Sequence, residues 1–200
     1  MPVPVKIDTG SDWMMMPTRD CISCFKYDSE KCGTIYNEPD KDHSCGEGFD
    51  PSPAYATLVT KGVERTYGST KLNGKIWHDT MCVGYNCLIN FEFFSYHKEK
   101  LFSNTASSSS VIGLSQSNPN YNTGPSFTDY LYRQLMISKS SFSLAMNGYD
   151  SAAYLDFGDP LKSRTKTNSN TIYLYSNYEI FWSVFIQGVS FAPEMVLENS

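Results

Sequence analysis

The sequence predicts a mainly β protein built from antiparallel strands. Short apolar or alternating runs recur along the 200 residues with Gly, Asn and Pro between them, which is typical of strands joined by turns. Asn147-Gly148 separates two of these runs and supplies the positive backbone angles that a tight hairpin needs. We therefore expect strands within residues 55–60, 75–83, 88–96, 141–146, 153–157, 171–175 and 180–191.

One stretch has helical rather than alternating spacing. In residues 126–137 the larger side chains recur at intervals of three and four, and Ser126 stands three residues before Asp129, where it can cap the first turn. We expect one helix here, packed on the sheet. The three tryptophans, Trp13, Trp77 and Trp182, are expected in the core.

Composition excludes two classes of partner. The formal net charge is −5 and no basic cluster occurs, whereas binding to nucleic acid requires concentrated positive charge. No window contains the about 18 to 20 apolar residues of a membrane-spanning helix. We expect neither a nucleic-acid partner nor a membrane partner.

Six cysteines form two groups in the sequence. Cys82 and Cys87 flank a short turn-like stretch, so a local disulfide closing a hairpin is expected there. The other four could pair among themselves or, with His43, hold zinc, since Cys-x-x-Cys places two thiolates on one metal readily. Disulfides are favoured, which indicates an oxidising compartment, and no metal is expected. The pairing of Cys21, Cys24, Cys32 and Cys45 stays open.

The chemistry-bearing motif is Asp8-Thr9-Gly10-Ser11, which follows the apolar residues Val5 and Ile7. This order places a carboxylate where a strand turns. Gly10 permits a sharp turn and close backbone approach, while the hydroxyls of Thr9 and Ser11 can bond an ionised carboxylate. The pattern indicates half of an acid protease active site.

Three further segments follow in order: the cysteine-rich residues 21–45, then Arg65-Thr66-Tyr67-Gly68-Ser69, then Val111-Ile112-Gly113-Leu114. The succession resembles the amino-terminal lobe of the pepsin-like aspartic proteases, over nearly the whole chain. The resemblance implies a pepsin-like acid protease lobe, which is an antiparallel double-layered β-sheet with one or two short helices. Val111–Leu114 is expected to be a core strand.

The resemblance also implies roles for individual residues. Asp8 matches the first of two catalytic aspartates that hold a water molecule between them. Gly10 matches the backbone donor beside it, Ser11 the hydroxyl that bonds the carboxylate, and Thr9 the residue that joins the two catalytic loops. Tyr67, Gly68 and Ser69 match the tip of a flap that closes over the substrate. Where many relatives carry Leu-Trp-Val, this chain has Met14-Met15-Met16, so the flap tyrosine lacks its usual indole partner.

The expected organisation is an incomplete two-lobe architecture. Residues 1–160 would form the amino-terminal lobe, and residues 161–200 the interlobe segment with the first strands of the second lobe. The sequence contains one Asp-Thr-Gly and no second Asp-Thr/Ser-Gly. Both ends are therefore expected to be truncated, and the piece is expected to be inactive alone.

The resulting hypothesis is an aspartic endopeptidase, secreted or lysosomal/vacuolar, that cuts proteins at acid pH beside bulky apolar residues without a cofactor. Its partners would be a protein or peptide substrate and the missing carboxy-terminal lobe. Two alternatives remain open: a non-catalytic binding or inhibitory module with half a pepsin fold, and a homodimeric protease in which each copy supplies Asp8.

Overall fold

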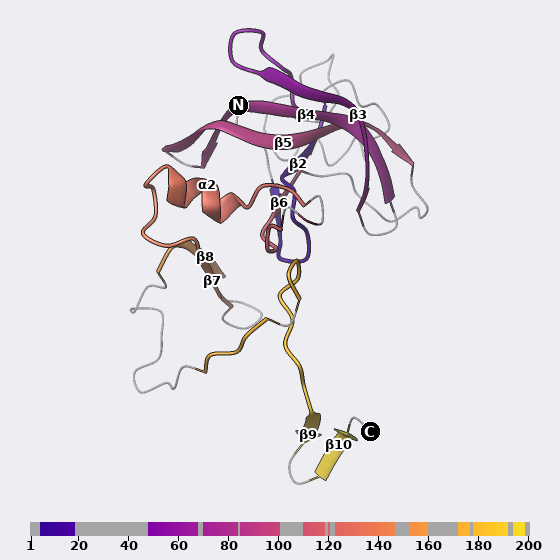
Figure 1. Cartoon of the computed structure of the whole chain (residues 1–200), viewed down its shortest axis with the longest axis vertical. Helices are drawn as coiled ribbons and strands as arrows, with labels where there is room; N and C mark the ends of the chain where they lie inside the picture. The colour runs from indigo at the N-terminus through magenta and orange to yellow at the C-terminus, as the bar shows by residue number, and fades with distance from the viewer. Residues whose placement is uncertain are drawn as a thin grey trace, which may run out of the picture.

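The computed structural model describes eleven stretches of the chain. They are residues 5–18, 48–67, 70–83, 85–100, 110–118, 120, 123–146, 153–159, 172–176, 178–191 and 194–198. This part of the chain is mainly β, as the sequence predicts, and its principal element is a six-stranded sheet in the order β1-β6-β2-β5-β4-β3 (Figure 1). The strands of the sheet are β1 (Val5–Asp8), β2 (Met15–Pro17), β3 (Thr57–Tyr67), β4 (Thr70–Val83), β5 (Asn86–Lys100) and β6 (Ser110–Gly113).

The three long strands β3, β4 and β5 form an antiparallel meander. The predicted runs at 75–83 and 88–96 are the central parts of β4 and β5, and the run at 55–60 overlaps the start of β3. The predicted runs are shorter than the strands. Charged side chains near the strand ends, such as Arg65 and Lys71, conceal the apolar alternation there.

Two pairings are parallel and depart from the antiparallel prediction. β1 pairs with β6, with Asp8 opposite Gly113, and β2 pairs with β5, with Met15 opposite Phe94. Parallel neighbours need a long connection between them, and the pairs here lie far apart in the sequence. The alternation of apolar and polar residues within one strand does not indicate which distant strand will pair with it in parallel.

Two apolar clusters cover the two faces of the sheet. One contains Trp13, Met15 and Phe94, with Val63 and Tyr67 of β3 packed against it. The other contains Met14, Phe91, Phe93, Ile112 and Leu114, together with Phe127 and Leu131. Successive methionines therefore point to opposite faces, and β5 is buried on both sides.

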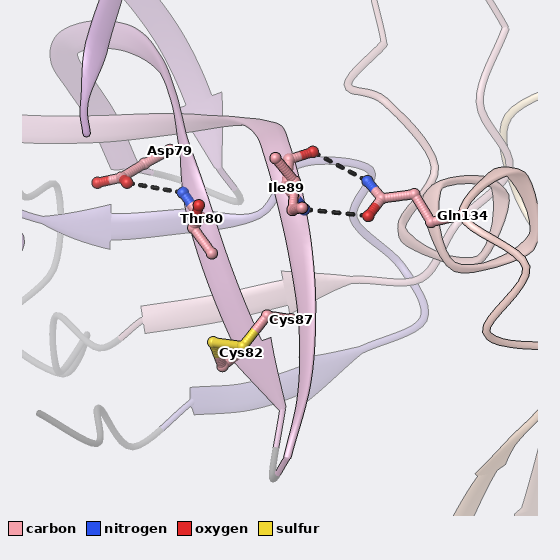
Figure 2. Close-up of a disulfide and its surroundings, with 6 residues drawn as sticks. All are labelled: Asp79, Thr80, Cys82, Cys87, Ile89 and Gln134. Atoms are coloured by element: carbon pink, nitrogen blue, oxygen red, sulfur yellow. Dashed lines mark hydrogen bonds between the residues drawn. A yellow bond between two sulfur atoms is a disulfide. The ribbon is translucent and has the colours of Figure 1, made fainter.

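The helix α2 (Phe127–Arg133) packs on the second cluster, as predicted. Ser126 caps it by accepting a hydrogen bond from the Asp129 N–H. The helix is shorter than predicted because Leu135 takes a positive φ of 58°, which ends helical geometry. The Gln134 side chain then bonds both the N–H and the C=O of Ile89 on β5, at 3.0 and 2.9 Å (Figure 2).

The predicted local disulfide between Cys82 and Cys87 is present and closes the β4–β5 hairpin (Figure 2). Cys21, Cys24, Cys32, Cys45 and His43 lie outside the described residues, and so does the predicted Asn147-Gly148 turn. The strands on either side of that turn are present and pair antiparallel: they are β7 (Phe142–Ala145) and β8 (Tyr154–Phe157).

The carboxy-terminal predictions are partly wrong. Residues 172–176 form no strand, and Tyr173 and Tyr175 are exposed. Within 180–191 only β9 (Gly188–Phe191) is a strand, paired with β10 (Glu194–Glu198) away from the main sheet (Figure 1). Trp182 is 55% exposed rather than in the core. An alternating run becomes a strand only where another strand accepts its backbone hydrogen bonds.

In the described stretches, no helix has both the length and the apolar character needed to cross a membrane.

We predict that Gly113→Ala destabilises the fold. A Cβ at Gly113 would meet the Ser11 carbonyl oxygen at 2.6 Å and the Trp13 nitrogen at 2.8 Å, both of which are backbone atoms. The expected cost is about 1 to 3 kcal/mol, measured by urea denaturation. Gly62→Ala is the control: its Cβ would meet nothing within 4 Å, so only the strain of φ +68° is expected, about 1 kcal/mol. A Gly113→Ala midpoint equal to that of the parent protein would contradict the packing argument.

Candidate active site

Asp8 is placed by backbone contacts between two distant segments. It ends β1 opposite Gly113, and its carbonyl accepts the Leu114 N–H at 2.8 Å. The loop that follows is held to the same region, since Gly113 donates to the Trp13 carbonyl and Ser115 to the Ser11 carbonyl, at 3.2 and 2.8 Å. The carboxylate therefore projects from a fixed strand end.

Each carboxylate oxygen of Asp8 accepts one hydrogen bond. The Gly10 N–H donates to Oδ1 at 2.9 Å, and the Tyr67 hydroxyl donates to Oδ2 at 2.5 Å. Tyr67 is the last residue of β3, and Gly68 and Ser69 lie outside the described residues. A hydroxyl bonded to a carboxylate makes a short, charge-assisted contact that favours the ionised acid.

The ionisation of the pair follows from this contact. Burial raises the pKa of Asp8, but the hydrogen bonds from Tyr67 and Gly10, together with the nearby Ser11 hydroxyl, hold that pKa below its usual value. Burial, together with the hydrogen bond to Asp8 and its charge, raises the pKa of Tyr67 to about 12, against the opposite influence of Ser11. At neutral pH the pair is an ionised Asp8 and a neutral Tyr67.

The structure brings together Asp8, Gly10, Ser11 and Tyr67 of the predicted set. Ser11 is buried, and its Oγ lies near enough to influence both pKa values. That Oγ nevertheless has no partner at hydrogen-bond geometry within the described residues. Thr9 follows Asp8 in the turn and is half-buried; its predicted role in joining two catalytic loops stays a prediction.

Tyr67 also lines a cavity of about 240 Å³. Its walls come from the loop after Asp8 and from the end of β3, and they comprise Ser11, Asp12, Trp13, Met15, Glu64, Arg65, Thr66 and Tyr67. The Arg65 guanidinium lies over the Trp13 ring, 3.8 Å from its centroid. Burial lowers the pKa of Arg65, while the charges of Asp12 and Glu92 oppose that shift.

Sequence reasoning missed Arg65 and Trp13 as parts of the site. The available signal was strand alternation, because Val63, Arg65 and Tyr67 share one face of β3 and the first and last pack on an apolar cluster. A charged residue between two inward-facing apolar ones marks an unusual environment. Met15 also lines the cavity, and its thioether cannot donate a hydrogen bond to Tyr67.

Comparisons with known proteins bear on this arrangement. The family model for the eukaryotic aspartyl proteases matches residues 3–200. The crystal structure of an aspartic proteinase from Irpex lacteus superimposes with a TM-score of 0.55 at 16% sequence identity, covering 84% of this chain and 44% of that one. This chain thus spans less than half the length of that proteinase, and the likeness concerns the fold. No curated protein matches the sequence.

We predict that Tyr67→Phe raises the pKa of Asp8, because it removes a bond that stabilises the ionised carboxylate and leaves the effect of burial. The measurement is a pH titration of the Asp8 carboxyl carbon by NMR. Tyr85→Phe, which changes a fully exposed tyrosine on the β4–β5 hairpin, is the control and should leave the titration unchanged. An unaltered Asp8 titration in Tyr67→Phe would contradict the assigned bond.

The lowered pKa of Asp8 makes the stability of the folded protein depend on pH. The pKa of Asp8 is lowered in the folded protein from the ordinary value of 3.8, so its contribution is present above that value and is lost as pH falls through the folded-state pKa. In Tyr67→Phe the folded-state pKa rises, so this contribution should shrink. Urea midpoints of the two proteins should therefore converge as the solution is acidified. A difference between the two midpoints that stays constant with pH would show that ionised Asp8 is not the hydrogen-bond partner of Tyr67.

Proposed function

Because the chain belongs to the eukaryotic aspartyl protease family, we propose that Asp8 supplies one of the two carboxylates of an aspartic endopeptidase. The observation that carries the proposal is the state of Asp8. It is held at a strand end, half-buried and ionised, by the Gly10 N–H and the Tyr67 hydroxyl. An ionised carboxylate in a fixed position is suited to act as a general base.

The reaction is peptide hydrolysis by an activated water molecule. One carboxylate removes a proton from the water as it attacks the peptide carbonyl carbon, and the second, protonated, donates to the carbonyl oxygen. Two carboxyl groups placed close together share one proton, because both cannot ionise at that separation. The intermediate is tetrahedral and not covalently bound to the protein, and the chemistry needs no cofactor.

The second carboxylate has to come from another segment, since these 200 residues contain a single Asp-Thr-Gly motif. The proteinase from Irpex lacteus, of which this chain covers 44%, is compatible with a longer protein that carries a second lobe. Under this proposal residues 1–160 are the amino-terminal lobe, residues 161–200 lead into the second, and the 200 residues alone do not cleave peptides.

The hairpin that carries Tyr67 would close over the substrate. Tyr67 ends β3 beside Asp8, with Gly68 and Ser69 next in the chain. Closure over a bound peptide excludes water, and electrostatic interactions are stronger in the resulting low-dielectric site. The substrates would be proteins or peptides. The Cys82–Cys87 disulfide supports a secreted or lysosomal/vacuolar location.

The test is acid-pH peptide cleavage by the full-length natural protein. Asp8→Asn should lower kcat/KM by at least about 100-fold, because a carboxamide cannot accept the proton. Asp159→Asn removes an exposed carboxylate that pairs with Lys139 on the surface, and it should leave cleavage within about twofold.

Three other outcomes would contradict the catalytic assignment or favour a different function. Cleavage that survives Asp8→Asn would contradict the catalytic assignment. Cleavage by the 200-residue chain, rising with the square of its concentration, would favour the homodimeric protease. Peptide binding without cleavage in the full-length protein would favour the binding module.

A further inference from the structure

The strands that carry Asp8 and Tyr67 lie at opposite edges of the six-stranded sheet. β1 is one edge and β3 the other. Within the described strands β3 pairs with β4 alone, so no backbone ladder there joins the end of β3 to the loop after Asp8. The Tyr67 hydroxyl nevertheless bonds Asp8 Oδ2 at 2.5 Å. Side chains therefore have to hold these two segments together.

Arg65 and Trp13 make a contact between the two segments. The Arg65 guanidinium carbon lies 3.8 Å from the centroid of the Trp13 ring, which is the geometry of a cation–π interaction. Both residues line the cavity of about 240 Å³ whose walls come from the loop after Asp8 and from the end of β3. The stacked pair therefore connects the two walls of this cavity.

Trp13 offers a fixed surface for the guanidinium. The residue is 4% exposed and belongs to an apolar cluster of the sheet. Gly124 packs so close to the indole that a Cβ on Gly124 would lie 2.7 Å from two of the ring atoms. The Gly124 N–H also donates to Asp12 Oδ2, at 2.5 Å. A guanidinium stacked on this indole is thus held relative to the loop that follows Asp8.

Arg65 is placed to pass this restraint on to Tyr67. The two residues stand two positions apart on β3, so their side chains project from the same face of the strand. Arg65 is half-buried, and Tyr67 packs against the cluster that contains Trp13. Anchoring Arg65 limits the movement of the end of β3, which keeps the Tyr67 hydroxyl within reach of Asp8.

We propose that Arg65 is a positioning residue whose stack on Trp13 anchors the end of β3 and thereby holds the Tyr67 hydroxyl on Asp8. The importance of this anchor for peptide cleavage rests on the proposed function. The anchor itself and its effect on the Asp8 carboxylate do not, because they concern only side chains of this chain.

A stack of this kind is suited to acidic solution. An ion pair is lost when its carboxylate is protonated, whereas a cation–π contact needs only the permanently charged guanidinium and a neutral ring. Asp12 and Glu92 act on Arg65 through their charges, so protonation of either changes its surroundings. The test must therefore separate the stack from an ion pair.

Ionisable groups lie near this contact, or pair with groups that do, on four neighbouring elements. They are Lys6 and Asp8 on β1, Asp12 in the loop, Glu64 on β3, Lys71 and His78 on β4, and Glu92 on β5. The strands β2 and β6 contain no ionisable side chain.

The stack is tested by NMR of the full-length, 15N-arginine-labelled protein. The ring current of an indole shifts protons above its face to higher field. The Arg65 Nε–H should therefore resonate at higher field than that of Arg133, which is exposed at the end of α2, and should do so at neutral and at acid pH. Arg65→Leu assigns the signal. An Arg65 signal at the ordinary position, or a displacement that disappears on acidification, would overturn the proposal.

The positioning role is tested by the titration of the Asp8 carboxyl carbon. Arg65→Leu keeps an apolar side chain against Trp13 and removes the guanidinium, so the Tyr67 bond should weaken and the pKa of Asp8 should rise. In Tyr67→Phe that bond is absent, and adding Arg65→Leu should have much less effect. Arg133→Leu is the matched control and should leave the titration unchanged.

Two results of this titration would contradict the positioning role. An equal rise with and without the Tyr67 hydroxyl would show that Arg65 acts on Asp8 by its charge alone. An Asp8 titration that Arg65→Leu leaves unchanged would show that Arg65 does not position Tyr67. Neither measurement needs cleavage, so both decide the anchor even in a protein that cuts no peptide. The Asp8→Asn assay decides the proposed function separately.

Discussion

The parallel pairing of β1 with β6 is the constraint on which the site depends. It sets Asp8 opposite Gly113, and the Ser11–Trp13 backbone packs so close to Gly113 that a side chain there would collide with it. Backbone contacts therefore hold the strand end and the loop after it, and the bond from the Gly10 N–H to Asp8 Oδ1 holds the turn between them.

On this scaffold the antiparallel meander contributes the second half of the site. β3 directs Val63, Arg65 and Tyr67 inward, so its end lies against the cluster of Trp13, Met15 and Phe94. The Tyr67 hydroxyl then reaches Asp8 and shares in stabilising its negative charge. The Tyr67 hydrogen bond that favours ionised Asp8 also covers the Oδ2 atom of Asp8. Access to the carboxylate therefore depends on the position of the Tyr67 side chain.

The motifs and the fold class can be predicted from the sequence, but the contacts between the motifs cannot. Asp8-Thr9-Gly10-Ser11 and Val111–Leu114 were recognisable because their residue types suit a turn and a buried strand. Their parallel pairing could not be predicted, because it joins segments about 100 residues apart and the sequence of one segment does not indicate the other as its partner. Residues 172–175 show the reverse case: they belong to a run expected to be a strand, and they form no strand within the described part of the chain. The Tyr67–Asp8 bond depends on side-chain rotamers within the packed site, which no residue spacing encodes.

The proposed function depends on Asp8 being a catalytic carboxylate. The most direct measurement is a crystal structure of the full-length protein with a peptide analogue that carries a hydroxyl in place of the scissile carbonyl. If Asp8 is that carboxylate, the hydroxyl of the analogue lies at hydrogen-bond distance from it, about 2.5 to 3.0 Å. A bound analogue whose hydroxyl lies away from Asp8 would contradict the catalytic assignment.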